Sequence, residues 1–363
     1  MAFHPFDPFN DLPPLPPKVE LETAAILKRA LSASRSLAEL KGLYATLPDP
    51  RLLINTVALQ ESRDSTAIEN IVTTQDELYR ALLEAQPSHP AAKEVIRYRE
   101  AVYAGWEHMQ ERQGQLTVDG MVRVMQRIKD TQEGIRKTPG TILRNALTGE
   151  IVFTPPCCEE VIRRMLDELA SFFNDPQEPG GLDPLIKMAL IHYQFETIHP
   201  FADGNGRTGR ALNVLYLVGQ NLLPLPALYL SAYIVQYKQD YYRLLRAVTE
   251  KGHWEEWILF LLTAVDETAR LTIRKIREIL ELKTRLSQAI LELIGGSAGG
   301  IVLDLLFTLP YIKVETFVSR GIAHRQTASV YLRKLVEAGV LHAEKHGRTM
   351  YYINFHLMEI LGG

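Results

Sequence analysis

Cysteine is scarce in this chain of 363 residues: there are two, and they are adjacent, at Cys157 and Cys158. Neighbouring cysteines are poorly placed for an ordinary disulfide, and two thiols make neither a disulfide framework nor a cysteine metal site. The N-terminus also lacks the basic and apolar regions of a secretion signal. We therefore expect the protein to work in a reducing compartment, the cytoplasm.

Strong net charge and long hydrophobic runs are lacking as well. The formal net charge is −3, so no overall field draws the protein to nucleic acid or to an acidic membrane. The uncharged stretch 211–236 is too interrupted to span a membrane, and we expect no membrane partner. Its interruptions are Asn213, Gln220, Asn221, Pro224 and Pro226. The length allows two or three domains with buried cores.

The most informative segment is a polar one. Residues 199–210 read His-Pro-Phe-Ala-Asp-Gly-Asn-Gly-Arg-Thr-Gly-Arg, between two stretches with apolar residues at helical spacing. This pattern predicts a tight loop between two buried helices. A Walker-type phosphate loop is excluded, because no Gly-x-x-x-x-Gly-Lys-Ser/Thr occurs and the glycines do not follow a strand.

The residues of this loop suit a phosphate chain. Gly204 and Gly206 allow main-chain N–H groups to approach phosphate oxygens, and the start of the following helix adds its positive dipole end. Arg207 and Arg210 are three positions apart, so both guanidinium groups can grip phosphates from one helical face. Taken singly, a Gly-Asn-Gly segment is usually only a turn; together, these residues predict an anion site.

Two further loop residues suggest the chemistry. Asp203 lies close to the expected phosphates, which makes sense if it holds Mg²⁺. His199, with an ordinary pKa of about 6.5, could accept a proton from an attacking hydroxyl. It could alternatively act as the nucleophile itself, and a lone histidine at a helix end is more often structural.

The segment resembles the signature of Fic-domain proteins, His-Pro-Phe-x-Asp/Glu-Gly-Asn-Gly-Arg-x-x-Arg, and matches it at every specified position. The resemblance implies transfer of AMP from ATP to a Ser, Thr or Tyr hydroxyl of a target protein and of the protein itself. By this resemblance His199 is the base and Asp203 holds Mg²⁺. The triphosphate would be bound by Gly204, Asn205, Gly206, Arg207 and Arg210. The choice of ATP rests chiefly on the resemblance.

A second segment, Ser65-Thr-Ala-Ile-Glu-Asn70, resembles the inhibitory-helix motif of the same family, Ser/Thr-x-x-x-Glu-Gly/Asn. The motif places an inhibitory helix near residues 62–72, with Ser65, Glu69 and Asn70 as its site residues. In the family this glutamate pairs with the second arginine, here Arg210, and blocks the γ-phosphate position. From periodicity alone Glu69 would be a solvated helix residue. The resemblance leaves open whether Glu69 also assists removal of AMP.

Residues 141–155 predict a β-hairpin, with Thr148-Gly149 at its turn and a strand at Ile151–Phe153. In the family a hairpin at this position is a flap that docks the target protein through main-chain pairing; a plain surface hairpin is the alternative. Tyr241 and Tyr242 resemble an aromatic pair near the nucleotide base in relatives, although tyrosines at helical spacing more often belong to a core.

The predicted fold is mainly α: a Fic-type helical core with a β-hairpin flap and a small C-terminal winged-helix domain. The expected divisions are a proline-rich arm at 1–18, an N-terminal helical region at 19–112, a catalytic core at 113–270, a connecting helix at 271–294 and the winged-helix domain at 295–363. Gly295–Gly300 is interpreted as a hinge.

Within the C-terminal domain we expect helices at 301–307, 314–318 and 325–338 and two strands around Gly347, a pattern resembling a winged helix. The segment from residue 320 to residue 355 contains six Lys or Arg and two Glu. DNA binding, homodimerisation and target docking all remain open. An ATP-sensing DNA-binding regulator is thus the alternative function, but sensing alone would not need His199.

Overall fold

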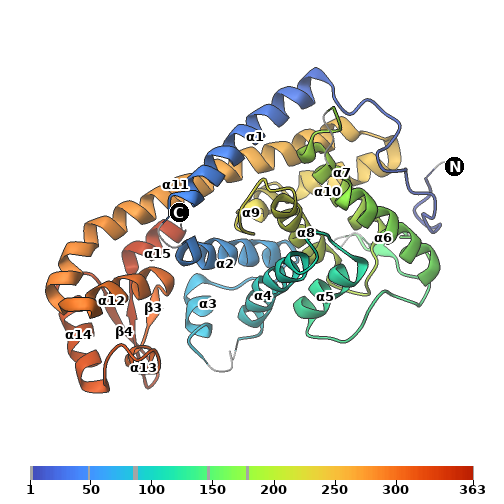
Figure 1. Ribbon diagram of the computed structural model, residues 1–363. Coiled ribbons are helices and arrows are strands. Elements are labelled where there is room, and N and C mark those ends of the chain that lie inside the picture. Colours follow the sequence, from blue (N-terminus) through green and yellow to red (C-terminus); the bar gives the residue numbers. More distant parts are fainter. Residues whose placement is uncertain (1–2, 48–49, 85–88, 145–147, 177–179, 363) are drawn as a thin grey trace.

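The computed structural model describes residues 3–47, 50–84, 89–144, 148–176 and 180–362 (Figure 1). The predicted mainly α-helical fold is confirmed, with two small antiparallel sheets. The N-terminal and central elements are α1 (Ala24–Ala45), α2 (Pro50–Ile68), α3 (Gln75–Ala81), α4 (Pro90–Gln110), α5 (Val118–Lys129), β1 (Leu143–Arg144), β2 (Ile151–Phe153), α6 (Glu159–Asn174), α7 (Pro184–Ile198), α8 (Asn205–Gly219), α9 (Leu230–Gln236) and α10 (Lys238–Lys251). None of the described helices is both long and apolar enough to cross a membrane.

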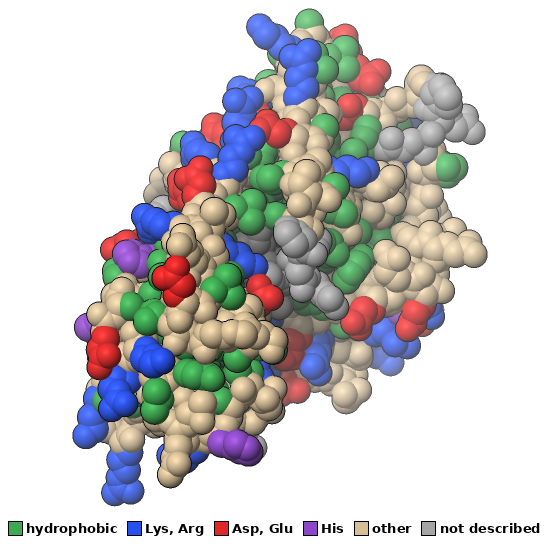
Figure 2. Space-filling model, turned by 60° about the vertical axis from the view of Figure 1, so that its left-hand side comes forward, with side chains coloured by type: hydrophobic (Ala, Val, Ile, Leu, Met, Phe, Trp, Pro, Cys, Tyr) green, Lys and Arg blue, Asp and Glu red, His purple; other side chains and the backbone are tan. Residues whose placement is uncertain are grey.

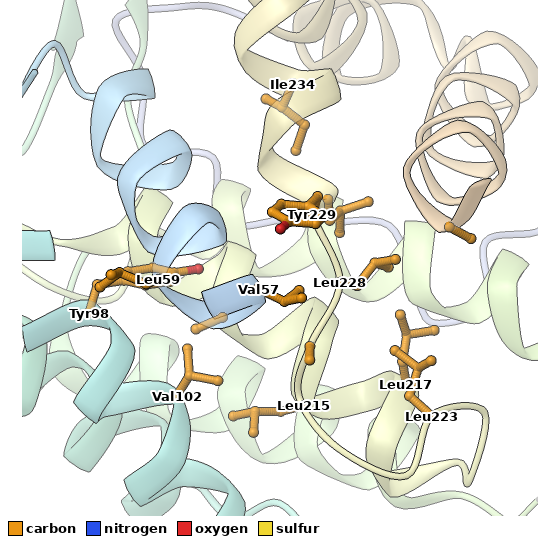
Figure 3. Close-up of a cluster of buried hydrophobic side chains, with 14 of the residues drawn as sticks. Val57, Leu59, Tyr98, Val102, Leu215, Leu217, Leu223, Leu228, Tyr229 and Ile234 are labelled. Atoms are coloured by element: carbon orange, nitrogen blue, oxygen red, sulfur yellow. The ribbon is translucent and has the colours of Figure 1, made fainter. Parts of the chain in front are cut away.

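The centre of the molecule is the pair α7 and α8, joined by the polar loop. Both helices are buried around most of their circumference, α7 by α6, α8 and α11, and α8 by α4 and α5. Figure 3 shows apolar side chains of α2, α4, α8 and α9 meeting in one buried cluster. Full burial of one large apolar side chain contributes about 1.5–3 kcal/mol, so this cluster holds α2, which carries Ser65, firmly against α8.

Helix α11 (Trp254–Ile294) runs without a break for 41 residues. The expected division between residues 270 and 271 therefore falls inside a continuous helix. No proline or glycine occurs in this stretch, and its apolar positions continue in helical register. Helix α1 packs along α11, and the two form one long edge of the molecule in Figure 1.

The glycine-rich segment after α11 is more compact than the hinge we expected. Gly295 alone breaks the helical path, with φ of 79°, and α12 (Gly296–Thr308) starts at the next residue. Four of the segment's six residues are glycine, a composition that suggests a flexible linker. In the structure, residues 296–300 instead form the first turns of α12. The helix expected at 301–307 therefore starts closer to the N-terminus.

The C-terminal unit, residues 296–362, has the three helices and the hairpin that the sequence indicates. They are α12, α13 (Val314–Ser319), α14 (Arg325–Glu337), β4 (His342–His346) and β5 (Thr349–Ile353). Two elements were not predicted: β3 (Tyr311–Ile312), which makes the sheet order β3-β5-β4, and α15 (Phe355–Gly362), which packs on α11. Both are too short to show a reliable period. The Tyr311 hydroxyl donates to Asp76 Oδ1 of α3 at 2.5 Å, so this unit contacts the N-terminal helices.

The expected hairpin is present as β1 and β2, which pair antiparallel with Leu143 opposite Phe153. Residues 145–147 of the expected 141–155 hairpin lie outside the described part of the chain. The proline-rich arm, described from Phe3, has no helix or strand and packs on this hairpin: the Phe3 and Phe153 ring centroids are 6.1 Å apart, and Thr154 Oγ1 donates to Pro5 O at 2.7 Å.

Candidate active site

The loop between α7 and α8 is closed by its own polar groups. His199 ends α7 in the left-handed region (φ 48°), and its N–H donates to Phe195 O at 3.1 Å. The buried Asn205 amide accepts from Phe201 N at 2.9 Å and donates to Phe201 O at 2.8 Å. Gly204, with φ of 86°, begins α8. The Asn205 side chain thus shapes the loop, and the unpaired N–H groups of the first turn of α8 face the site.

A cavity of about 360 Å³ lies at this end of α8. It adjoins a second cavity of about 390 Å³, with which it shares Lys129, Ala202 and Asp203 as lining residues. Together they have the size of a small-molecule site. The first cavity is lined by Glu69, Ile71, Lys129, His199, Ala202, Asp203, Gly204, Asn205, Gly206 and Arg207.

His199 presents one edge of its ring to this cavity. Nδ1 is buried, so Nε2 is the nitrogen that reaches the cavity. Burial lowers the pKa of His199 to about 4, and the nearby Arg136 guanidinium adds to this effect. Arg136 Nε donates to His199 O at 2.8 Å, and Arg136 N donates to Pro200 O at 2.9 Å. Arg136 therefore holds the backbone at His199, and the lowered pKa leaves the imidazole neutral and able to accept a proton at pH 7.

The lowered pKa gives a direct prediction. In ¹³C-histidine NMR spectra, with the His199 signal assigned by its loss in His199→Ala, the ring should titrate with a midpoint of about 4. The unfolded chain binds this proton at about pH 6.5, so the group's contribution to stability should fall as the pH drops from about 6.5 toward 4. A midpoint near 6.5 for the folded protein would contradict the buried, neutral ring.

Asp203 faces the cavity with 66% of its side chain exposed, and its Oδ2 lies 2.5 Å from Lys129 Nζ. Partial burial opposes ionisation of Asp203, but the bond to Lys129 outweighs it and holds the pKa below its usual range. The carboxylate is thus charged and accessible, which fits a Mg²⁺ ligand that shares the ion with phosphate and water oxygens. In the described part of the chain, at this site or any other, no three or more His, Cys, Asp or Glu side chains are grouped so that they could hold a metal ion.

Both arginines of the loop already have acidic partners. Arg207 is paired with Glu94 of α4, and only 3% of its side chain is exposed. Arg210 is 1% exposed; its Nη2 donates to Glu69 Oε1 at 2.6 Å and to Ser65 O at 2.9 Å, and its Nε donates to Ser65 Oγ at 2.9 Å. The structure therefore brings Ser65, Glu69 and Arg210 together.

Glu69 follows the last residue of α2 and covers the start of α8. A Cβ on Gly206 would come within 2.4 Å of Glu69 Oε1, so only glycine permits this approach. Burial opposes ionisation of Glu69, but Arg210 outweighs it and keeps its pKa below the ordinary value. Asn70 turns the chain with φ of 61° and accepts from Lys238 Nζ at 2.8 Å. The carboxylate is thus held ionised over the helix end where phosphates would bind.

The two tyrosines are placed differently from the other predicted residues. Tyr241 is buried, and its hydroxyl is 2.9 Å from His192 Nε2. Tyr242 is 46% exposed, with its ring centroid 5.1 Å from that of Tyr241. Neither residue lines the cavity. Tyr241 thus belongs to the core, and a position of either ring beside a nucleotide base stays a prediction.

Three residues that shape the site were missed from the sequence: Glu94, Lys129 and Arg136. They come from α4, from the last turn of α5 and from the segment after it. A Lys or Arg at the end of a helix and a Glu near its start are common, so no local pattern distinguishes these three. Only their pairing with the loop identifies them.

Models of known families match most of the chain. The Fic/DOC family N-terminal model matches residues 27–107, the Fic/DOC family model matches 115–217, and the C-terminal domain model of SoFic-like protein adenylyltransferases matches 302–357. The protein adenylyltransferase Fic of Nematostella vectensis is 25% identical over 223 residues, 59% of this chain and 48% of that protein. The protein adenylyltransferase fic-1 of Caenorhabditis briggsae is 36% identical over 72 residues, 20% of this chain and 14% of that protein.

The matched region thus spans about half or less of these curated relatives. Among solved structures, a Fic family protein from Desulfovibrio desulfuricans G20 aligns over 94% of this chain and 98% of its own, with a TM-score of 0.57 and 22% identity. Fic-1 of C. elegans (residues 134–508) aligns over 69% of this chain and 74% of its own, with a TM-score of 0.53 and 19% identity. These structures share the fold. From its loop, its fold and the three family models, the chain belongs to the Fic/DOC family.

Proposed function

We propose that the protein is an adenylyltransferase that moves AMP from ATP to a hydroxyl group of a target protein and of itself. The observation that carries the proposal is the placement of the neutral His199 ring on the wall of a cavity that ends at the first turn of α8. A positively polarised helix end suits a triphosphate, and a neutral imidazole beside it suits deprotonation of an alcohol.

The reaction would proceed in one displacement. The hydroxyl oxygen of a Ser, Thr or Tyr attacks the α-phosphorus of ATP while His199 Nε2 takes its proton. The bond between the α-phosphorus and the bridging oxygen breaks, and pyrophosphate leaves. Arg207 and the N–H groups at the start of α8 would stabilise the charge on the leaving group.

Asp203 would hold magnesium together with the phosphates. Its partner Lys129 would then turn from the carboxylate toward a phosphate oxygen, so that the cavity keeps its charge balance. Bound magnesium would supply further neutralisation of the triphosphate.

The contact between Glu69 and Arg210 would act as a brake. Arg210 is the group proposed to hold the γ-phosphate, and here its guanidinium is engaged by Glu69 and Ser65. ATP entering this state would find a carboxylate where its γ-phosphate belongs, and its α-phosphate would be misaligned for attack. Removal of AMP from a modified protein, if Glu69 assists it, would be a separate activity that depends on the same contact.

The hairpin β1–β2 is proposed as the docking edge for the target. The two strands form a sheet of their own, so an extended target segment could add to its edge by main-chain hydrogen bonds. The C-terminal unit would recruit the target or a second copy of the chain. Its exposed Lys and Arg side chains gather toward the lower left of Figure 2.

Those exposed basic residues also support DNA as a second candidate partner. All six Lys and Arg between residues 320 and 355 are exposed, although Arg325 Nη1 lies 3.1 Å from Glu315 Oε1. A gel shift of the full chain with duplex DNA should lose affinity steeply with salt if phosphate contacts are made. Absence of a shift at low salt would leave protein recruitment as the role of this unit.

The transferase activity is tested by incubating the protein with Mg²⁺ and ATP labelled at either the α- or the γ-phosphate. We expect label on protein from α-labelled ATP only, because pyrophosphate leaves with the β- and γ-phosphates. Labelling from γ-labelled ATP would indicate a kinase reaction, and no labelling in the presence of target lysate and of Glu69→Gly protein would contradict the proposal.

A further inference from the structure

Outside the proposed active site, the two cysteines form a second reactive centre. Although adjacent residues often point their side chains apart, Cys158 has φ of 69°, which turns its thiol back toward its neighbour. The Cys158 thiol donates to Cys157 Sγ at 3.1 Å. Cys158 is exposed and Cys157 is partly exposed, so a small solute can reach both sulfur atoms.

The surroundings favour a thiolate at Cys157. Asn10 of the N-terminal arm holds this residue: its Oδ1 accepts from Cys157 N at 3.0 Å, and its Nδ2 donates to Cys157 Sγ at 3.5 Å. The buried Arg136 guanidinium and the N-terminus of α6 provide positive charge nearby. The bond from Cys158 is the main cause that lowers the pKa of the Cys157 thiol, and it raises that of Cys158. These contacts make Cys157 the thiol that ionises more readily and Cys158 the thiol that donates to it.

We propose that Cys157 and Cys158 form a hydroperoxide-reactive dithiol that closes reversibly to a vicinal disulfide. The Cys157 thiolate attacks one oxygen of hydrogen peroxide; the O–O bond breaks, giving a sulfenic acid and, after protonation, water. The Cys158 sulfur then attacks Cys157 Sγ, the S–S bond forms, the S–O bond breaks, and a second water leaves. The two thiols supply the two electrons that reduce the peroxide.

Adjacent Cα atoms are about 3.8 Å apart, closer than in ordinary disulfides, which makes such a bond easy to reduce. A mild thiol reductant should therefore restore the pair. This reversibility distinguishes the site from cysteines that serve only as small apolar residues.

Oxidation of the pair would reach the proposed base through Arg136. This side chain donates from Nη2 to Pro156 O at 2.5 Å, next to Cys157, and from Nε to His199 O at 2.8 Å. Drawing the two sulfur atoms into a bond shifts the chain at Cys157, next to the Pro156 carbonyl group that Arg136 holds. We expect AMP transfer to fall severalfold on oxidation. This second step rests on the proposed function, whereas the thiol chemistry does not.

The test uses the chain of 363 residues, in which these two are the only cysteines. After hydrogen peroxide treatment, the intact mass should fall by two hydrogen atoms, both thiols should resist alkylation, and dithiothreitol should restore them. In Cys158→Ser, dimedone should trap a sulfenic acid at Cys157. In Cys157→Ser, Cys158 should react about tenfold more slowly. Oxygen addition without loss of hydrogen in the wild type, disulfides between chains, or equal rates in the two variants would overturn the proposal.

The coupling is measured separately, as AMP incorporation before oxidation, after oxidation and after reduction. Both serine variants should have the activity of the reduced wild type and should resist the severalfold loss. Equal incorporation by oxidised and reduced wild type would refute the coupling. If no form incorporates AMP, the proposed function fails, while the mass and alkylation results still decide the dithiol.

Discussion

Replacing Glu69 with glycine is expected to raise AMP incorporation from α-labelled ATP by about 10²-fold, the size of effect that a misplacement of about 1 Å at a reacting centre produces. The substitution removes the carboxylate that lies 2.6 Å from Arg210 Nη2 and leaves that guanidinium to the γ-phosphate. It also clears the space above Gly206, where Glu69 Oε1 now lies. The measurement is the initial rate of automodification, together with labelling of lysate proteins.

Two controls separate this effect from loosening of the fold. Glu69→Gln keeps the size of the side chain and a hydrogen-bond acceptor but loses the charge, so its rate should lie between those of the wild type and Glu69→Gly. Arg210 would lose an ionic partner in Glu69→Gly, so the thermal stability of that variant should fall and should recover when ATP and Mg²⁺ are added. Incorporation equal to or below that of the wild type would refute the brake.

Replacing His199 with alanine in the Glu69→Gly background should reduce AMP incorporation by about 10²–10⁴-fold, the usual contribution of a general base. Binding of ATP and Mg²⁺ should be retained, because the phosphate site is formed by α8, Arg207 and Arg210. His253 provides a matched control, because it is exposed and its ring lies 3.1 Å from Glu256 Oε1, on the surface. His253→Ala should have the parent rate.

Rapid quenching of the parent protein decides between two roles of the ring, because His199→Ala is inactive under either. If His199 were the nucleophile, rapid quenching of the parent protein with α-labelled ATP would trap a labelled phosphohistidine before the target is labelled. We expect no such species, because the hydroxyl attacks directly. Activity retained in His199→Ala would exclude both roles.

The loop and the Ser65–Glu69 segment that contacts it could be recognised in the sequence because each is local. In the sequence, His199 to Arg210 occupy twelve consecutive positions, and Ser65 and Glu69 lie one helical turn apart. In the structure, Arg210 contacts both Ser65 and Glu69, although it lies 141 positions after Glu69 in the sequence. Short-range patterns thus predicted both halves of a long-range contact, and the family resemblance joined them.

The groups that tune the site could not be predicted in this way. Glu94 pairs with a residue 113 positions away, and Arg136 bonds to one 63 positions away. Lys129 reaches Asp203 from the end of α5. Each of these residues is of a common type at an ordinary place in a helix or loop, and only the packing of α4 and α5 against α8 gives it a partner.

The helices α11 and α12 differ from the expected segments at two places, each for a physical reason. Composition suggested a hinge at Gly295–Gly300, but burial of Gly299, Val302 and Leu306 in α12 stabilises a helix there despite the low helix propensity of glycine. The division at residue 270 rested on the residue pattern, whereas the helical backbone of α11 continues through that position. Helix ends are set by breakers and caps, and α11 has none until Gly295.

We propose that a triphosphate binds at the first turn of α8 and that Glu69 competes with it for Arg210. A crystal structure of Glu69→Gly with magnesium and a non-hydrolysable ATP analogue would show whether it does. We predict the γ-phosphate within hydrogen-bond distance of Arg210, the metal on Asp203 and His199 Nε2 facing the α-phosphorus. A nucleotide bound elsewhere, or Arg210 still turned away from every phosphate, would contradict the account.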